Sequence, residues 1–393
     1  MELQKLSLAQ RNMMRDILED TSSRFQADHG IAQPVTEKYV EELLEYSEEC
    51  SEAGEEYWYV ITNSGKEEVG YAAIYWIETA HRHADIMIHI LPRYRRRGYA
   101  YEAGERLLSL VFDEMGMHKA CCELMEGNEA YAGLIQKLGF TQDGFRSDMY
   151  FSHGRYYGNY YFSLLEEEYR GERNVSRREL TREFQSPLGA GTGTGAGAGA
   201  RAGAGTGEIR RTPYYWESNR IRITGMTEEF LAANREILDC REDQLLYISR
   251  KMEEDDEVFA DAEELLELNE DNDSIAYAIV DSGGIYIGNI NLVGIDYVNG
   301  RFSYNIYVCR EHRGKGYGTE ALRMILGYAF LELRMHKMIC NANWGNEASA
   351  AMMRSVGCHV EGVRRDEVKY EDKYVDMVMF GVTDREFAEK MGL

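Results

Sequence analysis

The sequence has little proline, no long apolar run and a shortage of basic residues. Only four prolines stand against 38 glycines in 393 residues. No stretch of about 18 apolar residues occurs, so we expect no membrane-spanning helix, and the first residues lack the apolar core of a secretory signal. With 68 acidic against 44 basic side chains, the formal charge is −24. That balance argues against direct nucleic-acid binding, because phosphate contacts need a basic surface.

Paired cysteine motifs are missing as well. The seven cysteines are an odd number, and no two of them form a C-x-x-C pair. We therefore expect reduced thiols in a cytoplasmic protein, with no metal site and no catalytic cysteine. The cysteines stand at positions 50, 121, 122, 240, 309, 340 and 358.

What is present is a globular composition interrupted by one glycine tract. At about 100–200 residues per domain, the length predicts two or three domains. Residues 189–207 alternate glycine mostly with alanine or threonine, which predicts a flexible linker with a root-mean-square reach of about 24 Å. We place the domains at residues 1–169 and 212–393, joined by an arginine-rich tail and glycine linker at 170–211.

The two halves repeat each other at an offset of 218 residues. Between 95–162 and 313–380 there are 23 identities in 68 positions without a gap. The offset pairs Met117-His118-Lys119 with Met335-His336-Lys337, and Gly127-Asn128-Glu129-Ala130 with Gly345-Asn346-Glu347-Ala348. The chain therefore contains one fold unit twice.

Hydrophobic periodicity assigns similar elements to both halves. Consecutive strands, then one strand–loop–helix–strand unit and a closing hairpin, are typical of an α+β fold with a mixed sheet. In the first half we expect helices at 9–20, 36–46, 101–115 and 129–138, and strands at 57–62, 69–77, 84–90, 119–124, 141–151 and 155–165.

The most specific motif is a glycine-containing loop between a strand and a long helix. In the second half it reads Arg313-Gly314-Lys315-Gly316-Tyr317-Gly318, and in the first half Arg95-Arg96-Arg97-Gly98-Tyr99-Ala100. Small residues let the N–H groups at a helix start approach an anion closely, so the loop predicts a diphosphate site. Gly316 stands where a Walker loop needs Ser or Thr, and the glycine phase does not fit a dinucleotide fingerprint.

The pattern R-x-x-G-x-G/A at this junction resembles motif A of the GNAT acyl-CoA N-acyltransferases. Through their Met-His-Lys and Asn-Glu-Ala segments, both halves are also similar to the RimJ/RimL-type ribosomal-protein acetyltransferase branch. The resemblance covers both domains and leaves out the linker. It implies two GNAT-like α/β/α domains, each with a mostly antiparallel sheet and with acetyl-CoA or another acyl-CoA as co-substrate.

By that resemblance, the loop backbone holds the coenzyme pyrophosphate and the preceding strand runs beside the pantetheine. A strand N–H then polarises the thioester carbonyl. The coenzyme-binding residues implied are Ile88, Ile90, Arg95, Arg96, Arg97, Gly98, Tyr99 and Ala100 in the first half, and Ile306, Val308, Arg313, Gly314, Lys315, Gly316, Tyr317, Gly318 and Thr319 in the second.

The resemblance also places Asn128 and Asn346 near the thioester sulfur. A tyrosine seven residues later often protonates the leaving thiolate in this branch, but Ile135 and Met353 stand there. Tyr131 lies one turn earlier on the same helix face. It is either a substitute acid or a packing residue, and both interpretations stay open.

The general base has two main candidates in the first half, with Glu78 and its counterpart Asp296, at the end of the preceding strand, as further ones. The family frequently places an acidic residue on the strand before the loop, and Asp85 matches while Ser303 does not. His89 lies on the same strand face, has an ordinary pKa of about 6.5 and has Tyr307 as its counterpart. Either residue is a base or a satisfied strand residue.

The resemblance implies acetyl transfer to a primary amine by direct attack, either in both domains or in one catalytic domain beside a degenerate one. The acceptor is a small amine or a peptide or protein N-terminus. Residues 253–273 carry twelve acidic and no basic side chains, which favours either a cationic acceptor or a solvated acidic helix. Longer-chain acyl transfer and a non-catalytic acyl-CoA-binding or partner-binding scaffold are the alternatives, and the oligomeric state is not predicted.

Overall fold

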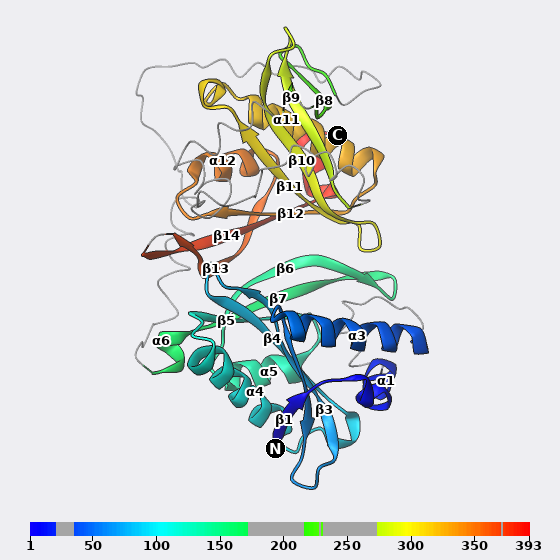
Figure 1. Ribbon diagram of the computed structural model, residues 1–393. Helices are drawn as coiled ribbons and strands as arrows, with labels where there is room; N and C mark the ends of the chain where they lie inside the picture. Colours follow the sequence, from blue (N-terminus) through cyan, green and yellow to red (C-terminus); the bar gives the residue numbers. More distant parts are fainter. Residues whose placement is uncertain (21–34, 172–215, 228, 231–272, 371) are drawn as a thin grey trace, which may run out of the picture.

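The computed structural model describes residues 1–20, 35–171, 216–227, 229–230, 273–370 and 372–393. The predicted linker at 189–207 and all but the last residue of the acidic segment 253–273 lie outside these ranges. The described strands form one 14-stranded sheet, in which the two halves follow each other as two blocks of seven. Figure 1 shows the blocks stacked, with the first half below the second.

The first half follows the element order that its periodicity predicts, with one strand added at its start. Its strands are β1 (Glu2–Lys5), β2 (Tyr57–Thr62), β3 (Glu68–Glu78), β4 (His83–Ile90), β5 (Lys119–Met125), β6 (Thr141–Ser152) and β7 (Arg155–Leu165). Its helices are α1 (Arg11–Glu19), α3 (Glu37–Ala53), α4 (Tyr99–Ser109), α5 (Glu129–Lys137) and α6 (Glu166–Tyr169). Short 3-10 helices are η1 (Leu8–Gln10) and η2 (Pro92–Tyr94), and a π-helical segment, η3 (Leu110–Glu114), continues α4. The spatial order is β1-β2-β3-β4-β5-β7-β6, and β4–β5 is the one parallel pair in this block of described strands.

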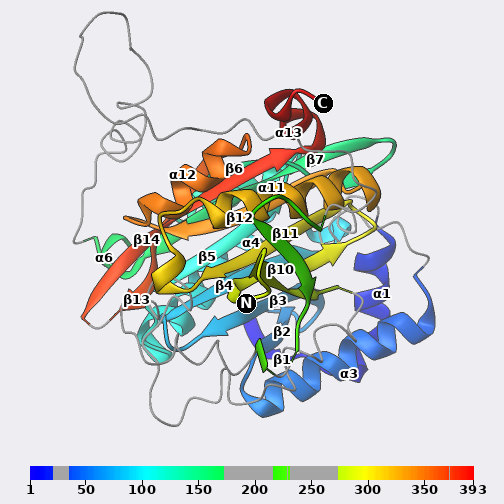
Figure 2. The same cartoon turned by 90° about the horizontal axis from the view of Figure 1, so that it is seen from above.

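Helices cover both faces of the first block. On one face, α1 and α3 bury Ile17 and Leu44 against β2 and β3. On the other face, Leu107 of α4 and Ile135 of α5 pack on the sheet. Strand β4 serves both clusters, because successive side chains of a strand point to opposite faces. The implied α/β/α layering of this domain is confirmed (Figure 2).

The second half repeats the strand order of the first half, with β8 as its outer edge strand. Its strands are β8 (Ile221–Gly225), β9 (Ile275–Asp281), β10 (Tyr286–Asp296), β11 (Arg301–Val308), β12 (Lys337–Asn343), β13 (His359–Tyr370) and β14 (Lys373–Thr383). Its helices are α11 (Tyr317–Gly327), α12 (Glu347–Ser355) and α13 (Asp384–Met391), with a 3-10 helix η6 (Arg310–His312) and a π-helical segment η7 (Tyr328–Glu332) that continues α11. A single core cluster joins α11, α12 and α13 to this block, through residues such as Leu322, Met353 and Phe387.

Strands β6 and β13 join the two blocks into one sheet. They pair antiparallel at Gly144 and Gly362, which the 218-residue offset also relates. A Cβ atom built on Gly144 would lie 2.8 Å from the Cα of Gly362, so both backbones need glycine to meet. Because the strand order runs in mirrored sequence on either side of this seam, an approximate two-fold axis passes through it.

Most predicted elements agree with the structure to within one or two residues, although α3 runs past its predicted end to Ala53. The edge strands β1 and β8 were not predicted, because four or five residues give too little alternation to recognise. The continuous sheet was not predicted either, since pairing between repeats has no periodic signal of its own. Among the described residues, no helix is long and apolar enough to span a membrane.

Candidate active site

Each half contains two parallel strands that part from each other. Strand β4 pairs with β5 only from His83 to Asp85, although it continues to Ile90. In the second half, β11 pairs with β12 only at Arg301 and Phe302. Past these residues the facing backbone groups have no strand partner, so each opening can receive an extended ligand along its edge.

The loop after each splayed strand presents the start of a helix. Gly98 and Gly316 are the N-cap residues of α4 and α11, with φ of 91° and 84°, and no side chain caps either helix. Arg96 adopts φ 60° where Gly314 has φ 72°, so both loops share one backbone shape. Left-handed backbone costs a non-glycine residue about 1–2 kcal/mol. Uncapped N–H groups at a helix start are suited to a phosphate.

The predicted coenzyme arginines hold the loop in place. The Arg95 Nε donates to the carbonyl of Ile90 at 3.0 Å, and its guanidinium pairs with Asp20. The Arg313 Nε likewise donates to the carbonyl of Val308 at 2.8 Å. These matching contacts turn the Nε of both arginines toward the protein, and anion binding by the loop backbone stays a prediction.

The remaining predicted coenzyme-binding residues are of two kinds: some offer only their backbone to the opening, and others are exposed at the surface. Ile88 and Ile90 point their side chains into the α4 core, so only their backbone faces the opening. Gly318 lies close to strand β11, because a Cβ there would be 3.4 Å from Val308 and 3.6 Å from Ile306. Tyr99 packs edge-on to Tyr94. Exposed or half-exposed positions are Arg96, Arg97, Ala100, Gly314, Lys315 and Thr319.

Arg220 adds a cation to the second loop that the sequence did not reveal. Its guanidinium donates to the carbonyl of Lys315 at 3.0 Å, pairs with Glu320 and lies over the ring of Tyr317. It precedes β8, an edge strand with no recognisable motif, so no sequence signal marked it.

Tyr131 reaches across the first opening. Its hydroxyl accepts a hydrogen bond from the N–H of Ile88 at 3.2 Å, although Tyr131 belongs to α5 and Ile88 to β4. Burial raises the pKa of this hydroxyl well above its usual value, and the neighbouring Cys122 raises it further. The hydroxyl therefore remains protonated beside a free strand edge. Ser349 stands at the equivalent position of the second half.

Asn128 and Asn346 begin the helices α5 and α12. Their side-chain oxygens accept from the backbone N–H of Tyr131 at 3.0 Å and of Ser349 at 3.1 Å. The glycines before them, Gly127 and Gly345, have φ of 96° and 89°. A tight turn followed by an N-cap accounts for the repeated Gly-Asn-Glu-Ala segment. The placement of both asparagines near a thioester sulfur stays a prediction.

Asp85 and His89 share the α1–α3 face of β4. Asp85 is 4% exposed, and burial together with the nearby Glu123 raises its pKa to about 8. The His89 ring stacks on Tyr71, and burial followed by the charge of Arg95 lowers its pKa to about 4. Tyr307, the counterpart of His89, is buried under the guanidinium of Arg313. Of the predicted catalytic positions, the first opening therefore has an aspartate and a histidine where the second has a serine and a tyrosine.

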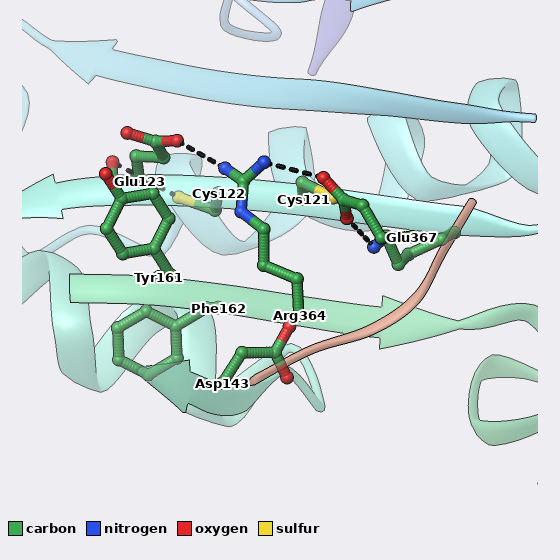
Figure 3. A pocket seen from close by; sticks show the side chains of 9 residues that line it. Cys121, Cys122, Glu123, Asp143, Tyr161, Phe162, Arg364 and Glu367 are labelled. Atoms are coloured by element: carbon green, nitrogen blue, oxygen red, sulfur yellow. Dashed lines mark hydrogen bonds and ion pairs between the residues drawn. The ribbon is translucent and has the colours of Figure 1, made fainter. Parts of the chain in front are cut away.

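The second half covers this face with its strand β13. Arg364 donates to Glu123 at 2.7 Å and to Glu367 at 2.6 Å, and Glu367 also pairs with Lys119 (Figure 3). Burial alone would raise the pKa of Glu367, but Arg364 and Lys119 outweigh it and hold that pKa well below its usual range. The carboxylate is therefore ionised, and the two halves share one ion network.

Both repeated histidines lie at the junction of the halves. His118 of the first half meets Asp366 at 2.9 Å and stacks on Tyr374. His336 of the second half stacks on Tyr156. The repeated Met-His-Lys segment therefore builds the junction rather than an opening.

Two parted parallel strands, followed by a glycine loop that opens a helix, define an acyltransferase type of domain, and the chain carries two. Residues 5–141 and 224–359 match the acetyltransferase (GNAT) domain family. The chain therefore belongs to the GNAT acetyltransferase family, and the fold expected from its motifs is confirmed.

Bacterial acetyltransferases are among its relatives. The SPbeta prophage-derived uncharacterized N-acetyltransferase YokL of Bacillus subtilis strain 168 is 31% identical over 30% of this chain and 66% of its own length. The putative ribosomal N-acetyltransferase YdaF of the same strain is 33% identical over 26% and 57%. Both matches span less than two thirds of the relative.

Polyamine acetyltransferases are also similar. The spermidine N(1)-acetyltransferase of Escherichia coli K12 is 25% identical over 34% of this chain and 73% of its own length. The Vibrio cholerae spermidine N-acetyltransferase, solved with CoA and spermine, is 21% identical with a TM-score of 0.39, covering 43% of this chain and 99% of that one.

Proposed function

We propose that the chain transfers an acetyl group from acetyl-CoA to a primary amine, and that the first domain carries out the reaction. The proposal rests on the Tyr131 hydroxyl, which accepts a hydrogen bond from the N–H of Ile88 inside the β4–β5 opening. The second domain keeps the loop but has Ser349 there. We assign the second domain a coenzyme-binding loop but no general acid.

The residues at the first opening fit coenzyme A. The uncapped start of α4 offers N–H groups to a pyrophosphate. The free edge of β4 past Asp85 offers backbone groups to the amides of an extended pantetheine arm. Acetyl-CoA supplies the acyl group as a thioester, which an amine attacks directly.

Three groups of the first domain then share the chemistry. When the thioester binds, its carbonyl takes the place of the Tyr131 hydroxyl at the N–H of Ile88, which then polarises that carbonyl. His89, which its lowered pKa keeps neutral at pH 7, accepts the proton of the attacking amine, directly or through water. As the N–C bond forms and the C–S bond breaks, Tyr131 gives its proton to the departing sulfur, and both residues return to their starting states by exchange with solvent.

We choose His89 over Asp85 as the base because of where each lies on β4. His89 is on the free stretch of the strand and is half-buried. Asp85 is the last paired residue, and it is buried on the face that the Arg364 network covers. An incoming amine can therefore reach His89 on the unpaired stretch of β4 more readily than it can reach Asp85.

We propose a small polyamine as the acceptor class. The formal charge of −24 attracts polycations, and spermidine acetyltransferases are among the relatives. Peptide or protein N-termini are the competing class, since a putative ribosomal N-acetyltransferase, YdaF, is also among the relatives.

The test is release of free thiol from acetyl-CoA with spermidine, a monoamine and a short peptide. We expect release with spermidine, and we expect Tyr131→Phe to lower kcat about 100-fold with unchanged coenzyme affinity, since general acids contribute roughly 10²–10⁴-fold. Ser349→Ala is the matched variant in the other domain and should not change kcat. Coenzyme binding without release for any amine would overturn the proposal.

A further inference from the structure

Three side chains with metal-binding atoms converge where β4 and β5 still pair. His83 and Asp85 are two residues apart, so they share one face of β4. The parallel register places Cys121 of β5 opposite Asp85. Their nitrogen, oxygen and sulfur atoms all lie within 4.8 Å of one another.

Two of these groups present buried atoms that nothing else in the described structure uses. The Nδ1 of His83 and the Oδ2 of Asp85 are shielded from solvent and have no hydrogen-bond partner among the described residues. Asp85 itself is 4% exposed. A buried polar atom without a partner costs about 1–3 kcal/mol, so such atoms are rare unless something binds them.

The cations nearby are already paired. Lys119 is bound to Glu367, and Arg364 is bound to Glu123 and Glu367. Figure 3 shows Cys121 beside this network, with the guanidinium of Arg364 turned to the two carboxylates. The network leaves the Asp85 carboxyl free to meet a further cation.

We propose that His83, Asp85 and Cys121 form a transition-metal site whose matching ion is Zn²⁺. Imidazole, carboxylate and thiolate are all zinc ligands, and three of them leave a fourth tetrahedral position open. Zinc–ligand bonds of about 2.0–2.3 Å set ligand atoms roughly 3.3–3.8 Å apart, so the three groups close inward by about 1 Å. A bound ion fastens β4 to β5 at the base of the opening.

The second half supplies an internal comparison. At the 218-residue offset, the equivalent positions are Arg301, Ser303 and Ile339. An arginine and an isoleucine provide no metal ligand, so one site per chain is expected. The sequence indicated no metal because the third ligand becomes a neighbour only through the strand register.

Cobalt titration of the full chain tests the site. We expect one equivalent of Co²⁺ to give a thiolate-to-cobalt absorption band together with the visible bands of tetrahedral cobalt, and Zn²⁺ to displace it. Cys121→Ser should remove the thiolate band, and Asp85→Asn should weaken cobalt binding at least about 10-fold. Cys122→Ala is the control, because that neighbour points into the opposite core.

Two results would overturn the site. One is the absence of cobalt binding to the wild-type chain. The other is a thiolate band that survives in Cys121→Ser. Circular dichroism establishes that each variant is folded, and the near-isosteric Asp85→Asn remains informative if the cysteine variant does not fold.

Discussion

Equivalent residues of the two halves have different surroundings, and the difference is concentrated at the openings. Tyr131 reaches a strand N–H, whereas Ser349 stands at the same place in α12. His89 stacks on an aromatic ring, whereas Tyr307 lies under a guanidinium. The motif residues repeat, but the chemistry of the side chains around them does not.

The ring of His89 should titrate far below an ordinary histidine. Its pKa is lowered to about 4, first by burial and then by Arg95. As pH falls from about 6.5 toward 4, the unfolded chain takes up this proton before the folded chain does, so the residue lowers stability in that window and not above it. Proton NMR of the ring, assigned with His89→Gln, should give a midpoint near 4. A midpoint near 6.5 would contradict the burial of this ring.

At the scale of elements, strand, loop and helix work as one unit in each half. The strand carbonyl holds the loop arginine, and the loop glycine opens the helix without a cap. The sequence predicted which residues form this unit and that a loop joins its strand to its helix. The hydrogen bond from Arg95 to Ile90 was not, because sequence spacing does not show which way a guanidinium turns.

Each loop should bind coenzyme A independently. Gly98→Val and Gly316→Val both place a β-branched residue at positive φ, which distorts the loop. Calorimetric titration with CoA should show two sites in the wild type, with one site weakened at least about 10-fold in each variant. Only Gly98→Val should stop acetyl transfer. Gly154→Val is the control, since it has φ 78° in open space at the β6–β7 turn. Turnover lost in Gly316→Val alone would reverse the assignment of the catalytic domain.

The sequence predicted the elements better than the site. Regular patterns recur along a strand or helix, so β2 and β7 were predicted to the residue. The Arg364–Glu123 pair and the His83–Asp85–Cys121 cluster depend on strand register and on contact between the halves. Those are properties of the assembled sheet, and local sequence carries little information about them.

At the scale of the whole molecule, the two halves share buried charge. Lys119 of the first half is 1% exposed and binds both Glu367 and the carbonyl of Arg365 from the second half. Lys337 of the second half pairs with Glu361 of its own half and donates to Ser147 of the first half at 3.2 Å. We therefore expect the stability of each half to depend on the other.

Lys119→Ala should destabilise the whole chain. Removing one partner of a buried ion pair costs about 3–5 kcal/mol, and unfolding should remain one transition because the sheet is continuous. The free energy of unfolding from urea titration measures the effect. Lys38→Ala, which breaks an exposed pair with Glu42, should cost less than about 1 kcal/mol. Two separate transitions in the wild type would show that the halves are independent.

The contact between Gly144 and Gly362 has a consequence for how the two openings can change. In a dimer of identical chains, a substitution appears on both sides of the axis at once, so neither site can be altered alone. Here one chain supplies both sides, and each position can vary by itself. The glycines at the axis must still match each other, because either Cβ would collide with the opposite backbone. Substitution is therefore most restricted at the axis and least restricted at the openings. This arrangement lets one half specialise in turnover while the other half is retained as the partner that covers it at the axis.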